Sequence, residues 1–216
     1  YQNGTITNPN CLLAGVVGRG KSMLAKAMAT RSIALGRKVY VPGDPKGEWS
    51  VVARAVDGVA IELGGGSPNR LNPLDEGPRP GVIADDEWAT LVASRRRALL
   101  GSLVESALNR PMSAVEHTAL DQALRAVVAA ARTEAGAGTP TLPMVVDALF
   151  NPSLPEAGAT IRELVTDGRD VGHALRRLVS GDLAGLFDGE STVTFDPSLP
   201  MISLDLSRIS GSDQLI

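Results

Sequence analysis

Eight consecutive residues, Gly15-Val16-Val17-Gly18-Arg19-Gly20-Lys21-Ser22, have the types and spacing that binding of a phosphate chain requires. In this G-x-x-x-x-G-K-S pattern, the Walker A motif, the glycines let backbone N–H groups surround a phosphate without conflict from Cβ atoms. Lys21 would neutralise charge on β- and γ-phosphates, and Ser22 would offer its hydroxyl to Mg²⁺. The predicted nucleotide contacts are Gly15, Gly18, Arg19, Gly20, Lys21, Ser22 and Met23; Ser22 is also the predicted metal ligand, and Lys21 a predicted catalytic residue.

A second chemical feature follows the next apolar run, in the segment Asp44-Pro45-Lys46-Gly47-Glu48-Trp49. Acids at the carboxyl end of a strand beside the phosphate loop would point into a nucleotide crevice, where they could position water or hold the metal's water shell. The same residues also contain two ordinary turn pairs, Asp-Pro and Lys-Gly. Spacing alone leaves both interpretations open. It also leaves open which of the two predicted catalytic acids, Asp44 and Glu48, faces the nucleotide.

Strands and helices that alternate along the chain must position these residues. Apolar runs predict strands at residues 11–15, 38–43, 59–63, 191–195 and 200–207. Helical periodicity predicts helices at residues 21–35, 47–55, 86–110, 113–135, 144–150, 157–167 and 171–180. For the first helix, the predicted buried side consists of Met23, Leu24, Ala27, Met28, Ile33 and Leu35. The alternation implies an α/β fold with a mostly parallel sheet that is covered on both faces.

The composition changes after a loop rich in glycine, proline and asparagine at residues 64–81. Residues 86–180 are rich in Ala, Leu and Arg and lack the alternation of a strand, so we expect an all-helical insertion at one side of the sheet. Ser113 and Glu116 are spaced as a capping box at the start of one of its helices. The expected organisation is the first part of a nucleotide-binding domain at 1–85, the insertion at 86–180 and a return to the nucleotide-binding domain at 181–216.

The overall composition is that of a globular protein. Of the 216 residues, 44% are hydrophobic and 21% are charged. The net charge of −3 argues against a uniformly basic nucleic-acid binder, and the aromatic content of 3% argues against a base-stacking platform. The single cysteine, Cys11, excludes an intramolecular disulfide, and its place in an apolar run predicts burial. No segment predicts a membrane span or a signal peptide, and Tyr1 at the first position predicts a piece of a longer protein.

Two other features have simpler explanations than a functional site. The run Arg95-Arg96-Arg97 could contact nucleic acid or an acidic partner, but the solvated side of a surface helix is the favoured interpretation. His117 and His173 lack a second His or Cys at metal-ligand spacing, so neither predicts a zinc site.

The motifs beyond the phosphate loop occur in a specific order. They are "NPNCLLAGVVGRGKS", "VYVPGDPKGEW", "RLNPLD", the helical stretch, "LAGLFDGESTVTF" and "ISLDLS". From about residue 5 to residue 207, this order resembles the FtsK/HerA superfamily of RecA-like motor ATPases, and within it the conjugative-transfer and type IV secretion ATPases of the VirB/TraC kind. The family carries D-P-x-G-E-[YW] after its second strand, N-P-[LF]-D after its third, and a helical subdomain before F-D-G. The resemblance implies a P-loop NTPase fold of the RecA-like type.

One departure from the family concerns its Walker B strand, which is an apolar run ending in Asp-Glu. In the family this strand, a sensor and an arginine finger lie beyond the F-D-G and D-L-S segments, and none of them is found in this sequence. Asp205 is the nearest match, but Leu206 follows it, so a structural role is favoured over metal binding. The resemblance therefore implies an incomplete ATPase core that stops before Walker B.

The resemblance also implies a function. It implies an ATP-binding motor domain that, in the full protein, hydrolyses ATP with Mg²⁺ to drive transfer of DNA or protein through a conjugation or type IV secretion apparatus. It further implies a membrane-anchored partner complex, a location at the cytoplasmic face of the inner membrane, a homo-hexameric full protein, and a monomeric, weakly active or inactive chain of the present length. Two alternatives stay open: a non-catalytic nucleotide-binding or assembly module, and a DNA translocase of the same superfamily.

Overall fold

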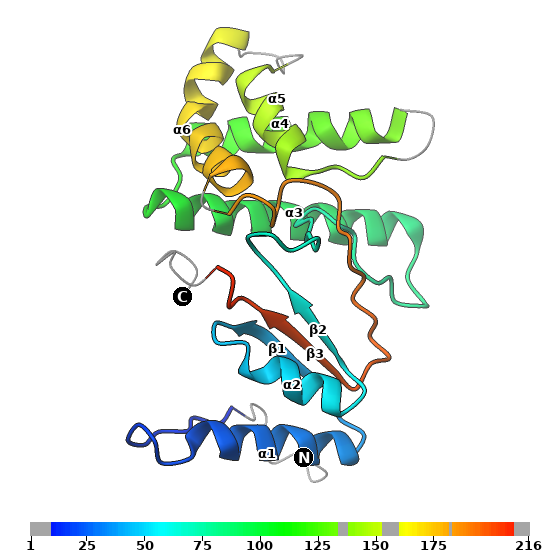
Figure 1. Ribbon diagram of the computed structural model, residues 1–216. Helices are drawn as coiled ribbons and strands as arrows, with labels where there is room; N and C mark the ends of the chain where they lie inside the picture. Colours follow the sequence, from blue (N-terminus) through cyan, green and yellow to red (C-terminus); the bar gives the residue numbers. More distant parts are fainter. Residues whose placement is uncertain (1–9, 134–137, 153–159, 182, 210–216) are drawn as a thin grey trace.

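The computed structural model describes residues 10–133, 138–152, 160–181 and 183–209. The described residues form an α/β structure whose helices lie on both sides of a small sheet (Figure 1). The strands are β1 (Val39–Asp44), β2 (Val59–Glu62) and β3 (Met201–Asp205). The helices are α1 (Lys21–Ala34), α2 (Glu48–Ala55), α3 (Asp85–Leu108), α4 (Ala114–Thr133), α5 (Leu142–Phe150) and α6 (Ile161–Ser180).

The sheet is parallel, with the strand order β1-β3-β2. The last of the described strands, β3, therefore lies in the centre, and its register places Val39 beside Met201 on one side and Val59 beside Ile202 on the other. A central strand in a parallel sheet is covered on both sides, and four of the five residues of β3 are accordingly buried. These strands confirm the predictions at 38–43, 59–63 and 200–207.

The two faces of the sheet have different covers. Side chains alternate along a strand, so Met201, Ser203 and Asp205 share one face, over which α2 packs. Ile202 faces the other way, into an apolar core that it shares with Ile61 of β2. This cover is incomplete at the edge of the sheet, because Tyr40 of β1 pairs in register with Ile202 yet is 55% exposed.

Helices α3 to α6 follow one another in the sequence between β2 and β3. Helices α4, α5 and α6 pack on one another, whereas α3 packs mainly on α6. Many of their buried residues form one core together with Ile61 and Ile202 of the sheet, and Leu63 and Leu74 belong to the same core. The largest fully buried side chains of this core in the helices are Leu100, Val104, Leu142, Val145, Val171 and Leu175.

Helix α6 is one continuous helix, where the sequence predicted two shorter ones at 157–167 and 171–180. Residues 157–159 lie outside the described residues. Two glycines lie on the side of α6 that faces α5, and a Cβ at Gly172 would come within 2.8 Å of the ring of Phe150. These glycines permit close packing of two helices and do not end the helix.

Two predicted strands are absent from the described residues. Residues 11–15 have no regular structure, and no described strand lies beside them. The segment 191–195 lies against Arg70 and Asn72, but side-chain hydroxyls supply part of the pairing. The amide of Arg70 donates to Thr192 Oγ1 at 2.9 Å, and the amide of Asn72 donates to Ser191 Oγ at 2.7 Å. Because hydroxyl acceptors replace carbonyls, a regular ladder does not form.

Helix α1 is less buried than its sequence predicts. Among the described elements it packs mainly against α2 and β1, and it has no buried residue; Met23 is 72% exposed. Cys11, just before the loop, is exposed as well, so its predicted burial is wrong. None of the described helices is both long enough and apolar enough to cross a bilayer.

Candidate functional site

The phosphate-loop motif forms a tight turn that leads directly into α1. Gly18 and Gly20 have left-handed backbone conformations, with φ of 80° and 82°, and Gly20 is the N-cap of the helix. A Cβ at either glycine would meet no atom within 4 Å. Glycine is therefore needed for the backbone conformation itself, since other residues adopt a positive φ only with strain.

The loop presents unsatisfied donors to solvent. Within the described part of the chain, the amides of Gly18, Gly20, Lys21, Ser22 and Met23 have no hydrogen-bond acceptor. Lys21 folds back over the loop, where its Nζ donates to the carbonyl oxygens of Gly15 at 2.7 Å and Val16 at 3.0 Å. Free amides at a helix N-terminus beside a lysine form a favourable site for an anion.

Glu48 lies close to this helix. Ser22 and Lys26 are one turn apart on the same face of α1, and Lys26 Nζ donates to Glu48 Oε2 at 3.0 Å. The hydrogen bond from Lys26 lowers the pKa of Glu48, so the carboxylate is ionised at neutral pH. The Glu48 side chain is 46% exposed, which leaves it accessible to a ligand or to water.

Asp44 occupies a different environment. It is buried, and its carboxylate accepts hydrogen bonds from the amides of Trp49 at 2.6 Å and Lys46 at 3.3 Å. These contacts stabilise the turn between β1 and α2. Of the two acids that the sequence left open, Glu48 is thus the exposed one and Asp44 the one engaged by the fold.

Asp205 also stabilises this turn. Its carboxylate accepts hydrogen bonds from Ser50 Oγ at 2.6 Å and from the amide of Ser207 at 3.0 Å. Burial raises the pKa of Asp205, but the hydrogen bonds from Ser207 and Ser50 outweigh burial and leave the pKa below its ordinary value. The close approach needs a glycine, because a Cβ at Gly47 would lie 3.0 Å from the carboxylate. These contacts are those of a structural residue.

The polar groups around the loop fit a metal ion that is bound mainly by the phosphate oxygens of a nucleotide and by water. Among the described residues, no group of three His, Cys, Asp or Glu side chains could hold a metal ion. Mg²⁺ in nucleotide sites takes one or two protein ligands in addition to phosphate oxygens and water. Ser22, which is exposed at the start of α1, could supply such a ligand.

Two arginine contacts that the sequence did not reveal organise the later motifs. Arg70 of the "RLNPLD" segment donates from Nε to Asp188 of the F-D-G segment at 2.6 Å, so two motifs far apart in the sequence lie together. Arg96, predicted as part of a solvated face, is buried instead, and its Nε donates to the carbonyl of Leu74 at 2.6 Å. The sequence pattern of three consecutive arginines does not indicate that the middle one, Arg96, is buried.

Comparisons with known proteins place the fold. No protein-family model and no curated protein sequence matches the chain. The structure of VirB4 of Thermoanaerobacter pseudethanolicus matches with a TM-score of 0.66 at 23% sequence identity, over 92% of this chain and 50% of that one. The chain thus spans half the length of the VirB4 structure. It shares the fold of VirB4 over nearly all of its own length, as a partial P-loop NTPase fold of the RecA-like type, which confirms at the level of the fold the resemblance to VirB4-type conjugative ATPases.

Proposed function

We propose that the chain is the phosphate-binding part of an ATP-dependent motor. In the whole protein, ATP hydrolysis would drive the transfer of DNA or protein through a conjugation or type IV secretion apparatus. The observation that carries the proposal is the turn with two left-handed glycines, whose free amides and Lys21 converge at the N-terminus of α1. The fold shared with VirB4 supports the choice of a transfer motor over other P-loop proteins.

The residues of the loop have separable roles in this proposal. The free amides of Gly18, Gly20, Lys21, Ser22 and Met23 donate to phosphate oxygens, and Lys21 exchanges its two carbonyl acceptors for phosphate. Mg²⁺, when bound, would neutralise phosphate charge, and the hydroxyl of Ser22 would serve as one of its ligands. The ionised carboxylate of Glu48 orients water. An ion pair with Lys26, which lies on the same face of α1 as Ser22, holds this carboxylate in place.

Lys21→Ala tests the assignment. We expect the dissociation constant for Mg·ATP, measured by calorimetry on the 216-residue chain, to rise at least about tenfold, since a hydrogen bond to a charged group contributes about 1.5–3 kcal/mol. Arg31→Ala, at the exposed far end of α1, is the matched control and should leave the affinity unchanged. Equal affinity of Lys21→Ala and the unaltered chain would refute the phosphate-loop assignment.

A non-catalytic nucleotide-binding module is the second candidate. This candidate is favoured because the carboxylates of both buried acids, Asp44 and Asp205, already accept hydrogen bonds that stabilise the fold and are therefore not available for catalysis. Steady-state turnover by the whole protein separates the two functions. Mg·ATP binding without any phosphate release would favour the module, and turnover that Glu48→Gln abolishes would favour the motor.

A further inference from the structure

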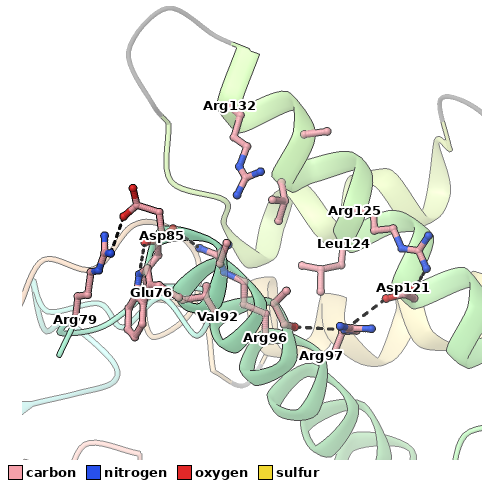
Figure 2. A pocket seen from close by; sticks show the side chains of 15 residues that line it. Glu76, Arg79, Asp85, Val92, Arg96, Arg97, Asp121, Leu124, Arg125 and Arg132 are labelled. Carbon is pink, nitrogen blue, oxygen red and sulfur yellow. Dashed lines mark hydrogen bonds and ion pairs between the residues drawn. The ribbon is translucent and has the colours of Figure 1, made fainter. Parts of the chain in front are cut away.

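A groove with a volume of about 690 Å³ lies between α3 and α4, outside the phosphate loop (Figure 2). Helix α3 contributes one stripe, from Trp88 to Arg97, and α4 contributes another, from Asp121 to Arg132. The stripe on α4 is about 16 Å long at about 1.5 Å per residue, which equals roughly three helical turns. The groove is open because α3 packs mainly on α6 and only slightly on α4.

The groove has an apolar floor and small residues along its walls. Val92 and Leu124 are buried beneath it, and Val128 is half-buried. The exposed wall positions include Ala93 and Ala129, where the absence of a long side chain lets another backbone approach. An apolar floor between small residues matches the requirements for packing a third helix.

The charge of the groove is opposite to that of the whole chain. Five arginines line it against three carboxylates, although the net charge of the chain is −3. Some of these charges pair: Arg79 with Asp85 at 2.6 Å, and Arg97 with Asp121 at 3.9 Å. Arg132 has no such pair, because no described carboxylate lies within ion-pair distance of it.

Arg132 and Arg96 bring two positive charges to the same part of the groove (Figure 2). Burial lowers the pKa of Arg96, Glu76 and Asp75 raise it, and the nearby charge of Arg132 lowers it, as expected for repulsion between two guanidinium groups. Glu76, the carboxylate within ion-pair distance of Arg96 among the described residues, lies 3.8 Å from it. A carboxylate entering the groove would relieve this repulsion.

We propose that the groove between α3 and α4 is a docking site for an acidic amphipathic helix of a partner protein. Its apolar ridge packs over Val128 between the alanines, and its carboxylates pair with Arg132 and the neighbouring arginines. This chemistry favours a helix over a nucleic acid, because a phosphate backbone would gain nothing from the apolar floor. It goes beyond the proposed nucleotide site and does not depend on it.

A synthetic probe tests the proposal with the 216-residue chain. The probe is a fluorescein-labelled, hydrocarbon-stapled peptide of about 15 residues, roughly four helical turns, with leucines on one face and glutamates beside them. Its twin carries lysines in place of the glutamates. Fluorescence anisotropy measures the dissociation constants of both. Ala93→Glu places a negative charge on the exposed wall, and Arg132→Ala removes the unpaired cation.

Two control variants carry the same substitutions outside the groove, so they test whether an effect on peptide binding is specific to the groove. Ala98→Glu makes the same change on the opposite side of α3, and Arg169→Ala removes an exposed arginine of α6. We expect Ala93→Glu to weaken binding of the acidic peptide more than tenfold and Arg132→Ala to weaken it about fivefold. Both controls should leave it unchanged, and the lysine twin should not bind.

Four outcomes would overturn the proposal. One is equal binding of the lysine twin, and another is an unchanged dissociation constant in both groove variants. The third is displacement of the acidic peptide by duplex DNA, because the occupant would then be nucleic acid. The fourth is self-association in sedimentation that only the groove variants abolish, because the occupant would then be a second copy of the chain.

Discussion

The carboxylate of Glu116 has more hydrogen-bond donors than any other acid near the start of α4. Its side chain is 7% exposed and accepts two hydrogen bonds from Arg110, at 2.9 and 2.6 Å. The amide of Ser113 donates to it at 2.7 Å, and the amide of Glu116 donates back to Ser113 Oγ at 3.4 Å. The predicted capping box of Ser113 and Glu116 is therefore confirmed. The hydrogen bonds from Arg110 and Ser113 outweigh burial, which acts in the opposite direction, and lower the pKa of Glu116 to about 2.

We expect Glu116→Gln to lower the free energy of unfolding by about 2 kcal/mol at pH 7, since it removes charge-assisted hydrogen bonds from a buried group. The native pKa lies below the ordinary value, so this stabilisation is present above about pH 4.5 and is lost as the pH falls toward 2. Urea denaturation at pH 7 and pH 3 measures the difference. Glu163→Gln, in the exposed capping box of α6, should lower the free energy of unfolding by less than Glu116→Gln does. An equal loss at both pH values would contradict this origin.

At the same scale, sequence reasoning singled out the phosphate-loop motif, whose function stays a prediction, but could not choose between Asp44 and Glu48. Both acids follow β1, and residue type and spacing are the same for a turn acid and for a site acid. The difference comes from burial and from Lys26, which lies 22 residues before Glu48 and meets it only when α1 and α2 are side by side. Pairing between helices is not encoded in a local pattern.

Helix α6 shows how two elements approach closely. A Cβ at Gly172 would lie 2.8 Å from the Phe150 ring, which Arg176 and His173 also contact. We expect Gly172→Ala to lower the free energy of unfolding by about 1–2 kcal/mol, because overpacking outweighs the gain of about 1 kcal/mol in helix propensity. Thermal or urea denaturation measures the change.

Gly101 of α3 is the matched control for this variant. A Cβ there would meet only Met112 at 3.7 Å, an ordinary contact. Gly101→Ala should therefore raise stability by about 0.5–1 kcal/mol through helix propensity alone. Stabilisation by both variants would mean that Phe150 moves aside easily and that Gly172 is not needed for packing.

The elements that the sequence predicted well are those whose pattern is local. The strands β1, β2 and β3 and the helices α1 to α5 lie where apolar runs and helical periodicity placed them. The predicted strands at 11–15 and 191–195 are absent because a strand needs a partner, and an apolar run does not specify one. The break predicted in α6 is absent because its glycines serve contacts with α5, which sequence periodicity does not reveal.

At the scale of the molecule, one core connects the sheet to the helices while α1 stays outside it. Leu63 and Leu74 belong to this core together with Ile202 of the sheet and residues of α3 to α6. In Figure 1, helix α1 lies at the edge of the molecule; it has no buried residue and, among the described elements, packs mainly against α2 and β1. The free energy of local opening is therefore expected to be lowest for α1, where few apolar contacts form. Ligand binding at the loop before α1 should consequently change the stability of this helix most.

Hydrogen exchange tests this difference across the whole chain. We expect the amides of α1 to exchange at least about a hundredfold faster than those of β3 and α6, which corresponds to a difference of about 2.7 kcal/mol or more in opening free energy. Mg·ATP should slow exchange selectively in α1 and the loop before it, because binding stabilises the closed form. Lys21→Ala should abolish this protection while leaving β3 and α6 unchanged. If the amides of α1 exchange as slowly as those of β3 before nucleotide is added, the prediction is wrong, because α1 is then held as firmly as the core despite its exposed surface.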